Sequence, residues 1–332
     1  VQLKEKHQMR SVQYEYDGDV ITLRFDSMLH RFDTIKVEIK YTAKPYERAS
    51  SGGKAITSDK GLFFINHDSS IPNKPQQVWT QGETSFNSCW FPTIDHPNER
   101  LTHDIYLTVH DKFETLSNGI KMFSVEAGDS LRTDYWKMDQ PHAPYLVMIA
   151  VGEFAMVQDS LDDLPVSYYV EPEYEKYAYD IFGNTPEMIR FYSDILGVSF
   201  PWKKYSQVVV RDYVSGAMEN TTAVVHGEFV QRTKRDLIDE NYEDVIAHEL
   251  FHHWFGNLVT CESWSNIAMN ESFATYGEFL WDEYKYGNDY AEFKAKNHLQ
   301  DYLTESIQKK EKIIRYHYNV PDDLFDAHSY SK

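Results

Sequence analysis

The stretch Val245-Ile246-Ala247-His248-Glu249-Leu250-Phe251-His252 decides the fold of this chain. On a helix, residues four positions apart lie about 40° apart, so His248 and His252 share one face. Their imidazoles can converge on one ion at about 2.0–2.1 Å, the length of zinc–nitrogen bonds. Glu249, about 100° from His248, cannot easily become a third ligand but can reach a water on the metal. The pattern is typical of a zinc peptidase in which Glu249 is the general base. His253, about 140° from His248, is interpreted as structural.

A third ligand is needed, because two surface histidines on one helix would give the same pattern. Glu271 supplies it at the start of the next predicted helix, over 271–286. Eighteen residues separate His252 from Glu271, enough for a helix end, a loop and a return. A catalytic zinc with three protein ligands keeps its fourth position for water or substrate. The sequence therefore predicts one zinc ion.

Composition excludes several classes of function. The net charge of −19 argues against a nucleic-acid partner and is compatible with cationic groups such as peptide ammonium ions. No apolar run is long enough to cross a membrane, and no signal peptide is visible in the first ten residues. Two cysteines, Cys89 and Cys261, are too few for a disulfide scaffold. The compartment stays open, since a leader could have been removed before Val1.

The patterns along the chain divide it into two parts. Strands are predicted over 20–25, 34–41 and 104–109, where β-branched and aromatic residues recur. After about residue 159 helices are predicted over 185–196, with Thr185 as N-cap, and over 242–255 and 271–286, followed by Gly256 and Gly287. One strand is predicted between them, over 207–211. We expect an α+β multidomain fold, with a β-rich domain over 1–159 and a mainly helical zinc catalytic domain over 160–332.

These motifs together resemble the M1 family of gluzincin aminopeptidases. The resemblance rests on His248, Glu249, His252 and Glu271 at their spacing, with Gly216-Ala217-Met218-Glu219-Asn220 before them. It runs from about Gln81 to Lys332. It implies a saddle-like β N-terminal domain followed by a thermolysin-like catalytic domain, and an enzyme that hydrolyses the N-terminal bond of peptides with a free N-terminus.

The resemblance also implies a role for each matched residue. His248, His252 and Glu271 match the zinc ligands, and Glu249 matches the base. Glu219 matches the residue that binds the substrate α-ammonium, within a substrate-binding segment formed by Gly216, Ala217, Met218, Glu219 and Asn220. A carboxylate beside the metal suits that task, because it holds the free N-terminus one residue from the zinc. Only the first peptide bond is then presented for cleavage.

Two further matches are less complete. Gln81-Gly82-Glu83 resembles a second ammonium-binding segment, although the Arg that usually follows is replaced by residues 84–90. Ser329-Tyr330-Ser331-Lys332 resembles the segment whose Tyr donates to the oxyanion, a task that a neutral phenol suits. Tyr330 lies 59 residues after Glu271, as in the family.

Three alternatives remain. An epoxide hydrolase of the same family would have Gly in place of Ala217 and Gln in place of Glu83. A scaffold protein that has lost its metal site would lack some of the ligands, which are all present here. A thermolysin-type endopeptidase would have no use for Glu219 as an ammonium anchor. The preferred first residue, the oligomeric state and the physiological peptide are not determined.

The chain stops before the Gly expected after Tyr330, and the family usually extends beyond both ends. We therefore expect a fragment, truncated in both domains, with a mobile Tyr330 and low activity by itself.

Overall fold

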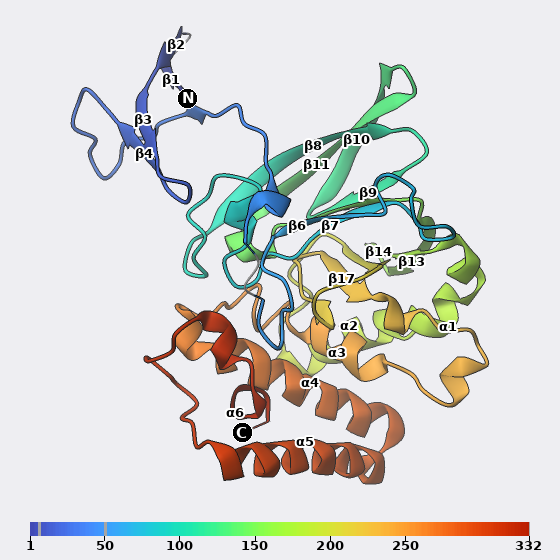
Figure 1. The fold of residues 1–332 in the computed structure, drawn as a ribbon. Coiled ribbons are helices and arrows are strands. Elements are labelled where there is room, and N and C mark those ends of the chain that lie inside the picture. The colour runs from blue at the N-terminus through green and yellow to red at the C-terminus, as the bar shows by residue number, and fades with distance from the viewer. Residues whose placement is uncertain (6–7, 50–51, 332) are drawn as a thin grey trace. The chain divides into compact units, whose positions relative to one another are not determined.

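The computed structural model describes residues 1–5, 8–49 and 52–331, which divide into two compact units, Val1–Lys44 and Pro45–Lys332 (Figure 1). The first unit contains the strands β1 (Gln2–Glu5), β2 (Gln8–Ser11), β3 (Gln13–Tyr16), β4 (Ile21–Arg24) and β5 (Val37–Glu38). They form a sheet of order β2-β1-β5 and a β3-β4 pair. The strand predicted over 20–25 is confirmed as β4, whereas only two residues of the stretch 34–41 are extended into a strand.

The second unit begins with two antiparallel sheets. One has the order β10-β11-β8 and the other β6-β7-β12-β9. Their strands are β6 (Leu62–Ile65), β7 (Gln77–Thr80), β8 (Leu101–His110), β9 (Glu114–Ser117), β10 (Ile120–Gly128), β11 (Leu131–His142) and β12 (Ile149–Gly152). Half-buried and exposed residues alternate along β8, which contains the predicted strand over 104–109.

A third sheet of mixed direction follows, with the order β13-β14-β15-β17-β16. It consists of β13 (Ala155–Leu161), β14 (Leu164–Val170), β15 (Tyr205–Val210), β16 (Ala217–Met218) and β17 (Ala223–Gly227). Three neighbours, β14, β15 and β17, run parallel. The strand predicted over 207–211 is confirmed as β15. The prediction that it is the one strand between the helices is wrong, because β15 lies in the middle of a five-stranded sheet. The predicted domain boundary at residue 159 falls inside β13 and stays a prediction.

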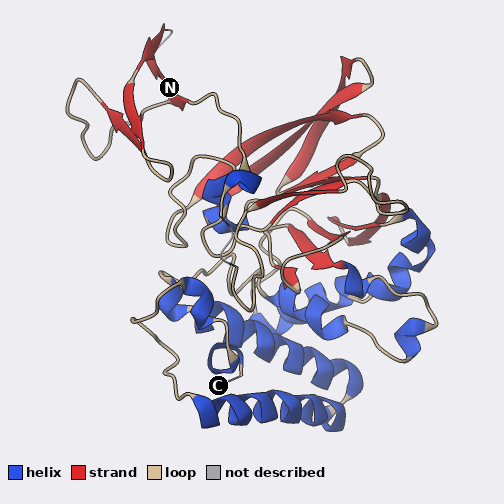
Figure 2. Cartoon of the chain, viewed as in Figure 1, coloured by secondary structure: helices blue, strands red, loops and turns tan. Residues whose placement is uncertain are grey.

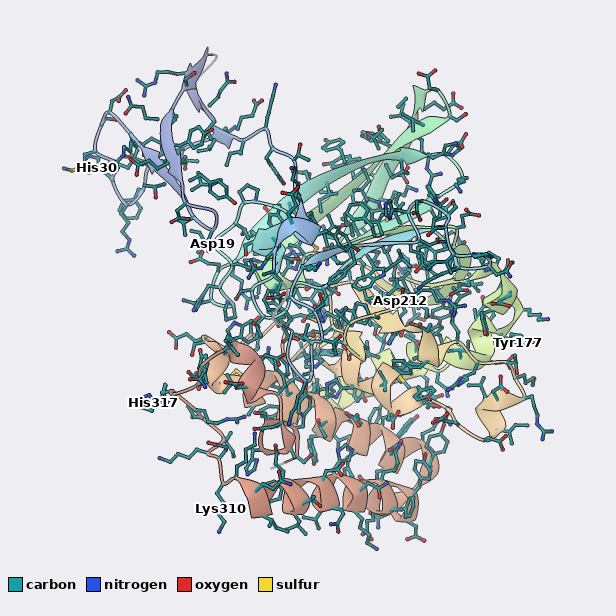
Figure 3. The ribbon with its side chains drawn as sticks, in the orientation of Figure 1. Asp19, His30, Tyr177, Asp212, Lys310 and His317 are labelled. Carbon is teal, nitrogen blue, oxygen red and sulfur yellow. The ribbon has the colours of Figure 1, made fainter. Side chains whose placement is uncertain are left out.

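Helices cover this sheet and fill the rest of the second unit (Figure 2). They are α1 (Ala178–Phe182), α2 (Thr185–Leu196), α3 (Glu243–Phe251), α4 (Ala268–Tyr286), α5 (Asn288–Gln308) and α6 (Ala327–Tyr330). Short 3-10 helices are η1 (Pro45–Glu47), η2 (Asn87–Cys89), η3 (Pro144–Leu146), η4 (Pro172–Tyr177), η5 (Glu228–Val230), η6 (Asp236–Ile238), η7 (Trp264–Asn266) and η8 (Pro321–Leu324). Residues 309–320, which include Lys310 and His317, connect α5 to η8 (Figure 3).

The helix ends differ in detail from the prediction. Asn184, not Thr185, occupies the N-cap position of α2, without a side-chain capping bond. Gly287 follows α4 with a φ of 90°, which confirms the predicted glycine stop. The helix predicted over 242–255 instead ends at Phe251, so Gly256 does not cap it.

Two hydrophobic clusters sandwich the third sheet. Ala223 and Val225 of β17 belong to the cluster around Trp79, Leu116 and Tyr145. Val224 points the other way, into the cluster that packs α2, α3 and α4 on the sheet. Met218 of the edge strand β16 is buried in the first of these clusters, and α3 lies against this strand.

A β-rich part followed by a helical part confirms the expected α+β class. None of the helices in the described part of the chain combines the length and the apolar character needed to cross a membrane.

Candidate metal centre and substrate site

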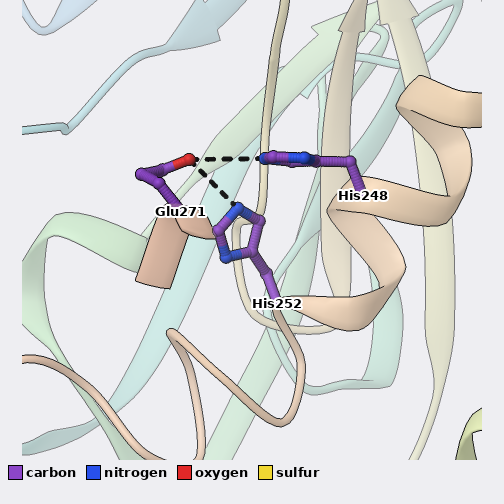
Figure 4. Close-up of side chains that lie close together, drawn as sticks. All are labelled: His248, His252 and Glu271. Atoms are coloured by element: carbon purple, nitrogen blue, oxygen red, sulfur yellow. Dashed lines mark hydrogen bonds and ion pairs between the residues drawn. The ribbon is translucent and has the colours of Figure 1, made fainter. Parts of the chain in front are cut away.

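The side chains of His248, His252 and Glu271 meet between α3 and α4 (Figure 4). One Glu271 oxygen, Oε2, lies 3.3 Å from Nε2 of His248 and 3.6 Å from Nε2 of His252. The candidate ligand atoms of these three residues all lie within 4.8 Å of one another. Two imidazole nitrogens and one carboxylate oxygen form the donor set of a catalytic zinc site, so these residues fit that ion.

The other nitrogen of each imidazole has its own partner. Nδ1 of His248 lies 2.5 Å from Oε1 of Glu278, and Nδ1 of His252 lies 3.0 Å from the carbonyl oxygen of Phe255. Both partners accept, so each Nδ1 donates a proton to its own partner, and each Nε2 faces Glu271, where it can bind a metal once it is deprotonated. Burial alone would lower the pKa of His248, but its hydrogen bonds to Glu271 and Glu278 raise it well above the usual value.

Glu249 is buried beside these ligands, with 6% of its surface exposed. Its Oε2 atom has no hydrogen-bond partner within the described part of the chain. Burial raises the pKa of Glu249 to about 8, although His248 and His252 act in the opposite direction. A buried carboxylate oxygen without a partner is costly, so its presence indicates a site built to bind something.

Glu219 follows the edge strand β16 and is also buried. Its Oε1 accepts a hydrogen bond of 3.0 Å from the Tyr145 hydroxyl, which in turn accepts one of 3.2 Å from the Asn270 amide. The amide of Asn257 donates to the Glu219 carbonyl oxygen at 2.8 Å. Both the side chain and the backbone of Glu219 are therefore fixed. Burial raises the pKa of Glu219, while His252 lowers it.

Glu83 lies in the loop after β7, with Oε1 buried and without a partner in the described structure. Its backbone N–H donates to Oε1 of Gln81 at 3.0 Å. Burial, followed by the charges of Glu219, Glu271 and Glu249, raises the pKa of Glu83 well above its usual value. Four buried carboxylates thus face one small volume, where cations would relieve their mutual repulsion.

A cavity of about 650 Å³ opens onto these groups. Of the predicted site residues, its walls include Glu83, Gly216, Ala217, Glu219, His248, Glu249, His252, Glu271 and Tyr330. Gln81, Met218 and Asn220 are absent from its lining. Met218 points into the hydrophobic core, as the alternation of side chains along β16 requires. The amide of Asn220 donates to the carbonyl oxygen of Leu146 at 3.2 Å. These three residues therefore do not line the cavity themselves.

Tyr330 is the last residue of α6 and its ring lies 6.2 Å from the His248 ring. Asp326 caps this short helix, accepting from the backbone of His328 and Ser329. Asp326 also pairs with Arg315 at 2.6 Å. The Ser272 hydroxyl of α4 donates to the Ser329 carbonyl oxygen. A helix cap, an ion pair and a hydrogen bond therefore fix the segment that we expected to be mobile.

His253 turns away from the metal ligands, as predicted. Its Nε2 accepts from the backbone N–H of Thr222 at 3.0 Å, and its Nδ1 donates to the Glu249 carbonyl oxygen at 3.1 Å. Burial lowers the pKa of His253 to about 3, so the ring is neutral. It links α3 to the segment that carries Glu219.

Sequence reasoning missed three supporting residues. Glu278 lies seven positions after Glu271 on the same helix face, and that spacing could have suggested a partner for His248. Asn270 is adjacent to Glu271 but carries no distinguishing pattern. Tyr145 reaches Glu219 across 74 positions of sequence, which no local pattern reveals.

Comparisons with known proteins show which family the chain resembles. The family model described as "Peptidase family M1 domain" matches residues 180–332, and "Peptidase M1 N-terminal domain" matches residues 2–146. Glutamyl aminopeptidase from Bos taurus is 31% identical over 73% of this chain and 26% of its own length. Alanine/arginine aminopeptidase from Saccharomyces cerevisiae is 28% identical over 76% of this chain and 30% of its own length. The chain thus spans about a quarter to a third of these relatives.

The fold is similar to that of solved structures. An M1 zinc metallopeptidase from Deinococcus radiodurans matches with a TM-score of 0.72 and 18% identity, over 97% of this chain and 67% of that one. A mutant form of that metallopeptidase, bound to a Tyr-Ser-Ala substrate, matches with a TM-score of 0.70 and 19% identity, over 97% of this chain and 68% of that one. With two family models that together match most of its length, the chain belongs to peptidase family M1.

Proposed function

We propose that this chain carries the active site of a zinc aminopeptidase, which removes single residues from the free N-terminus of peptides. The observation that carries the proposal is the position of two buried carboxylates, Glu83 and Glu219, beside the His248–His252–Glu271 group. Glu83, Glu219 and Glu271 have candidate ligand atoms that all lie within 4.8 Å of one another, and this proximity supports binding of a cationic group beside the proposed metal ligand Glu271.

We propose that His248, His252 and Glu271 hold one zinc ion, with Glu278 and the Phe255 carbonyl oxygen fixing the two imidazoles. The names of the solved M1 relatives support zinc. When bound, zinc polarises a carbonyl oxygen and lowers the pKa of water, which is the chemistry that amide hydrolysis needs.

Glu219 and Glu83 bind the substrate α-ammonium in this proposal. Tyr145 orients the Glu219 carboxylate by donating to one of its oxygens, which leaves the other oxygen for the ammonium. A carboxylate in a low-dielectric site favours a cation strongly over a neutral group. A peptide with a blocked N-terminus would leave both carboxylates buried without a counter-charge.

Glu249 is the general base, which takes a proton from the attacking water and delivers it to the leaving amine. Its position one residue after His248 and its unpartnered oxygen support this role. Tyr330 donates a hydrogen bond to the oxygen of the scissile carbonyl as negative charge develops there. Burial raises the pKa of Tyr330 well above its usual value, so the phenol keeps the proton that it donates.

The alternatives predict different substrates. An endopeptidase would cleave blocked and free peptides equally. An epoxide hydrolase would open an epoxide in preference to cleaving a peptide. A scaffold protein would have no hydrolytic activity on any of these substrates. The buried pair Glu83 and Glu219 favours an aminopeptidase over all three, because only that reaction always presents an ammonium group.

The test is the cleavage of matched substrates by the zinc-loaded protein. We expect a leucyl chromogenic amide to be cleaved at least about a hundredfold faster, in kcat/KM, than its N-acetylated form, because the acetyl group abolishes a charge-assisted contact. Equal cleavage of both substrates would contradict the proposal. Glu219→Ala should reduce this preference by raising KM for the free substrate alone.

A further inference from the structure

A turn formed by residues 52–57, here called the Gly-Gly turn, reaches the cavity from a part of the chain without any recognised motif. Ala55 and Ile56 line the cavity, and only 2% of Ile56 is exposed. The backbone N–H of Gly53 donates to the Ile56 carbonyl oxygen at 2.7 Å, which closes the turn.

Two contacts fix the Gly-Gly turn to segments that carry site residues. The Thr57 N–H and hydroxyl donate to the Val214 carbonyl oxygen at 2.9 and 3.1 Å, two residues before Gly216. The Asp322 carboxylate, in η8 before Tyr330, accepts from the backbone of Ile56 and Lys54. The turn is therefore held between the segments that contribute Glu219 and Tyr330.

Close approach explains the two glycines of the turn. A Cβ atom on Gly53 would lie 1.4 Å from Oδ2 of Asp322, and one on Gly52 would lie 2.0 Å from the Thr57 carbonyl oxygen. A side chain at position 53 would collide with the Asp322 carboxylate of η8, and one at position 52 would collide with the backbone of the turn itself. The sequence thus keeps Ala55 and Ile56 against the cavity.

The cavity lining contains both apolar and polar residues. Ala55, Ile56, Ala217 and Phe325 are apolar and lie in the Gly-Gly turn or close in sequence to Glu219 or Tyr330. The Lys294–Asp244 ion pair and the polar residues of α5 also line the cavity. Because Ala217 lies two positions before Glu219, a substrate bound there by its ammonium would have apolar lining within reach of its first side chain.

We propose that the Gly-Gly turn determines which first residue is accepted, with Ile56 as the wall that limits its size. This inference rests on the proposed aminopeptidase function. The substrate class is peptides that begin with a small or medium apolar residue, such as alanine or leucine. Acidic first residues are disfavoured, because Lys294, the one Lys or Arg of the cavity lining among the described residues, is paired with Asp244, and Glu83 and Glu219 belong to the same lining. The selectivity differs from that in the name of the glutamyl aminopeptidase relatives.

The test compares kcat/KM of the full-length, zinc-loaded protein for alanyl, leucyl, phenylalanyl and glutamyl amides. The unaltered protein should cleave the leucyl amide at least about a hundredfold faster than the glutamyl amide. Ile56→Ala should raise the phenylalanyl-to-alanyl ratio about tenfold, since a few methylenes in an apolar pocket are worth that much discrimination. Ala55→Leu should lower the same ratio. Ile94→Ala, at an isoleucine that is 72% exposed, is the matched control and should not change it.

Each outcome separates the two levels of the proposal. Cleavage of free substrates with the same ratio in all variants would overturn the role of the Gly-Gly turn while leaving the aminopeptidase function intact. A preference for the glutamyl amide would overturn the apolar substrate class. Failure of the unaltered protein to cleave any free aminoacyl amide would instead contradict the proposed function. If Ile56→Ala does not fold, as judged by circular dichroism, the phenylalanyl-to-alanyl ratio of Ala55→Leu still tests the role of the Gly-Gly turn. A lower ratio supports that role, and an unchanged ratio overturns it.

Discussion

Glu249 is the residue whose replacement should separate the chemistry of the site from its metal binding. It is not one of the three proposed zinc ligands, so replacing it need not release the metal. Its unpartnered oxygen lies in a cavity wall and can reach a water in that cavity.

Glu249→Gln should keep zinc and lose about 10²–10⁴ in kcat, the usual contribution of a general base. The amide is nearly the same size but cannot accept a proton. Elemental analysis measures whether the variant keeps zinc, and turnover of a leucyl amide measures the loss in kcat. Glu283→Gln, at an exposed position of α4, is the control and should behave as the unaltered protein. Near-normal turnover in Glu249→Gln would show that another group is the base.

Glu278→Gln tests how His248 is held. A carboxylate that accepts from a ligating imidazole fixes its orientation and increases its basicity, so its loss should weaken zinc binding about 10–100-fold. Competition with a zinc chelator measures the change, with Glu283→Gln on the same helix as reference. Unchanged zinc affinity would mean that the 2.5 Å contact to Nδ1 does not support the metal site.

At this scale the sequence alone predicted that His248 and His252 face one ion, because helical geometry places residues four positions apart on one face, and the structure brings Glu271 of α4 to the same place. The positions of Met218 and Asn220 could not be read in this way. They belong to the same five-residue motif as Glu219, but Met218 points from β16 into the hydrophobic core and the Asn220 amide donates to the Leu146 carbonyl oxygen. Membership of a motif does not determine which side a residue faces.

Among the secondary-structure elements, the short helix α6 positions Tyr330 at the cavity. Its four residues depend on the Asp326 cap and on the Arg315–Asp326 ion pair, both largely buried. Without Asp326 the buried Arg315 would lose its charged partner, which is strongly unfavourable. The position of Tyr330 therefore depends on the Asp326 cap and on its ion pair with Arg315.

A double-mutant cycle tests that dependence. Tyr330→Phe should reduce kcat about 10²–10³-fold, as removal of one oxyanion donor does. Asp326→Ala should approach that loss, and the double variant should be little worse than Tyr330→Phe alone, because both act through one hydroxyl. Asp289→Ala in the first turn of α5 is the control. Additive losses would show that Asp326 acts by another route.

The elements themselves were predictable to different degrees. The long amphipathic helices α2 and α4 agree with their 3.6-residue pattern, and β8 with its alternation. The strand β17 was missed because all five of its residues are buried, so it has no alternating pattern. The end of α3 was placed four residues too late, since apolar residues continue through Phe255 after the helix has ended.

At the scale of the whole molecule, acidic side chains are buried in the interior as well as exposed on the surface. Glu83, Glu219, Glu249 and Glu271 are each at most 6% exposed and lie around one cavity. Their mutual repulsion disfavours the folded state when no cation is present. A bound metal should therefore stabilise the fold as well as supply chemistry.

Removal of zinc with a chelator should lower the melting temperature by roughly 5–10 °C. Zinc at about a hundred times its Kd is worth about 2.7 kcal/mol, and each kcal/mol shifts the midpoint by a few degrees in a domain of this size. Added zinc should restore the midpoint. His252→Ala should melt at the same temperature with and without zinc. A chelator-insensitive midpoint in the unaltered protein would argue against a metal bound to the folded state.

The central claim is that His248, His252 and Glu271 hold one zinc ion. X-ray absorption at the zinc edge tests it most directly, on protein whose zinc content has been measured. We predict one zinc per chain, with two imidazole nitrogens at about 2.0–2.1 Å and the remaining ligands oxygen. The signal should be lost in His252→Ala. Sulfur ligands from Cys89 or Cys261, or a zinc signal unchanged in His252→Ala, would contradict the claim.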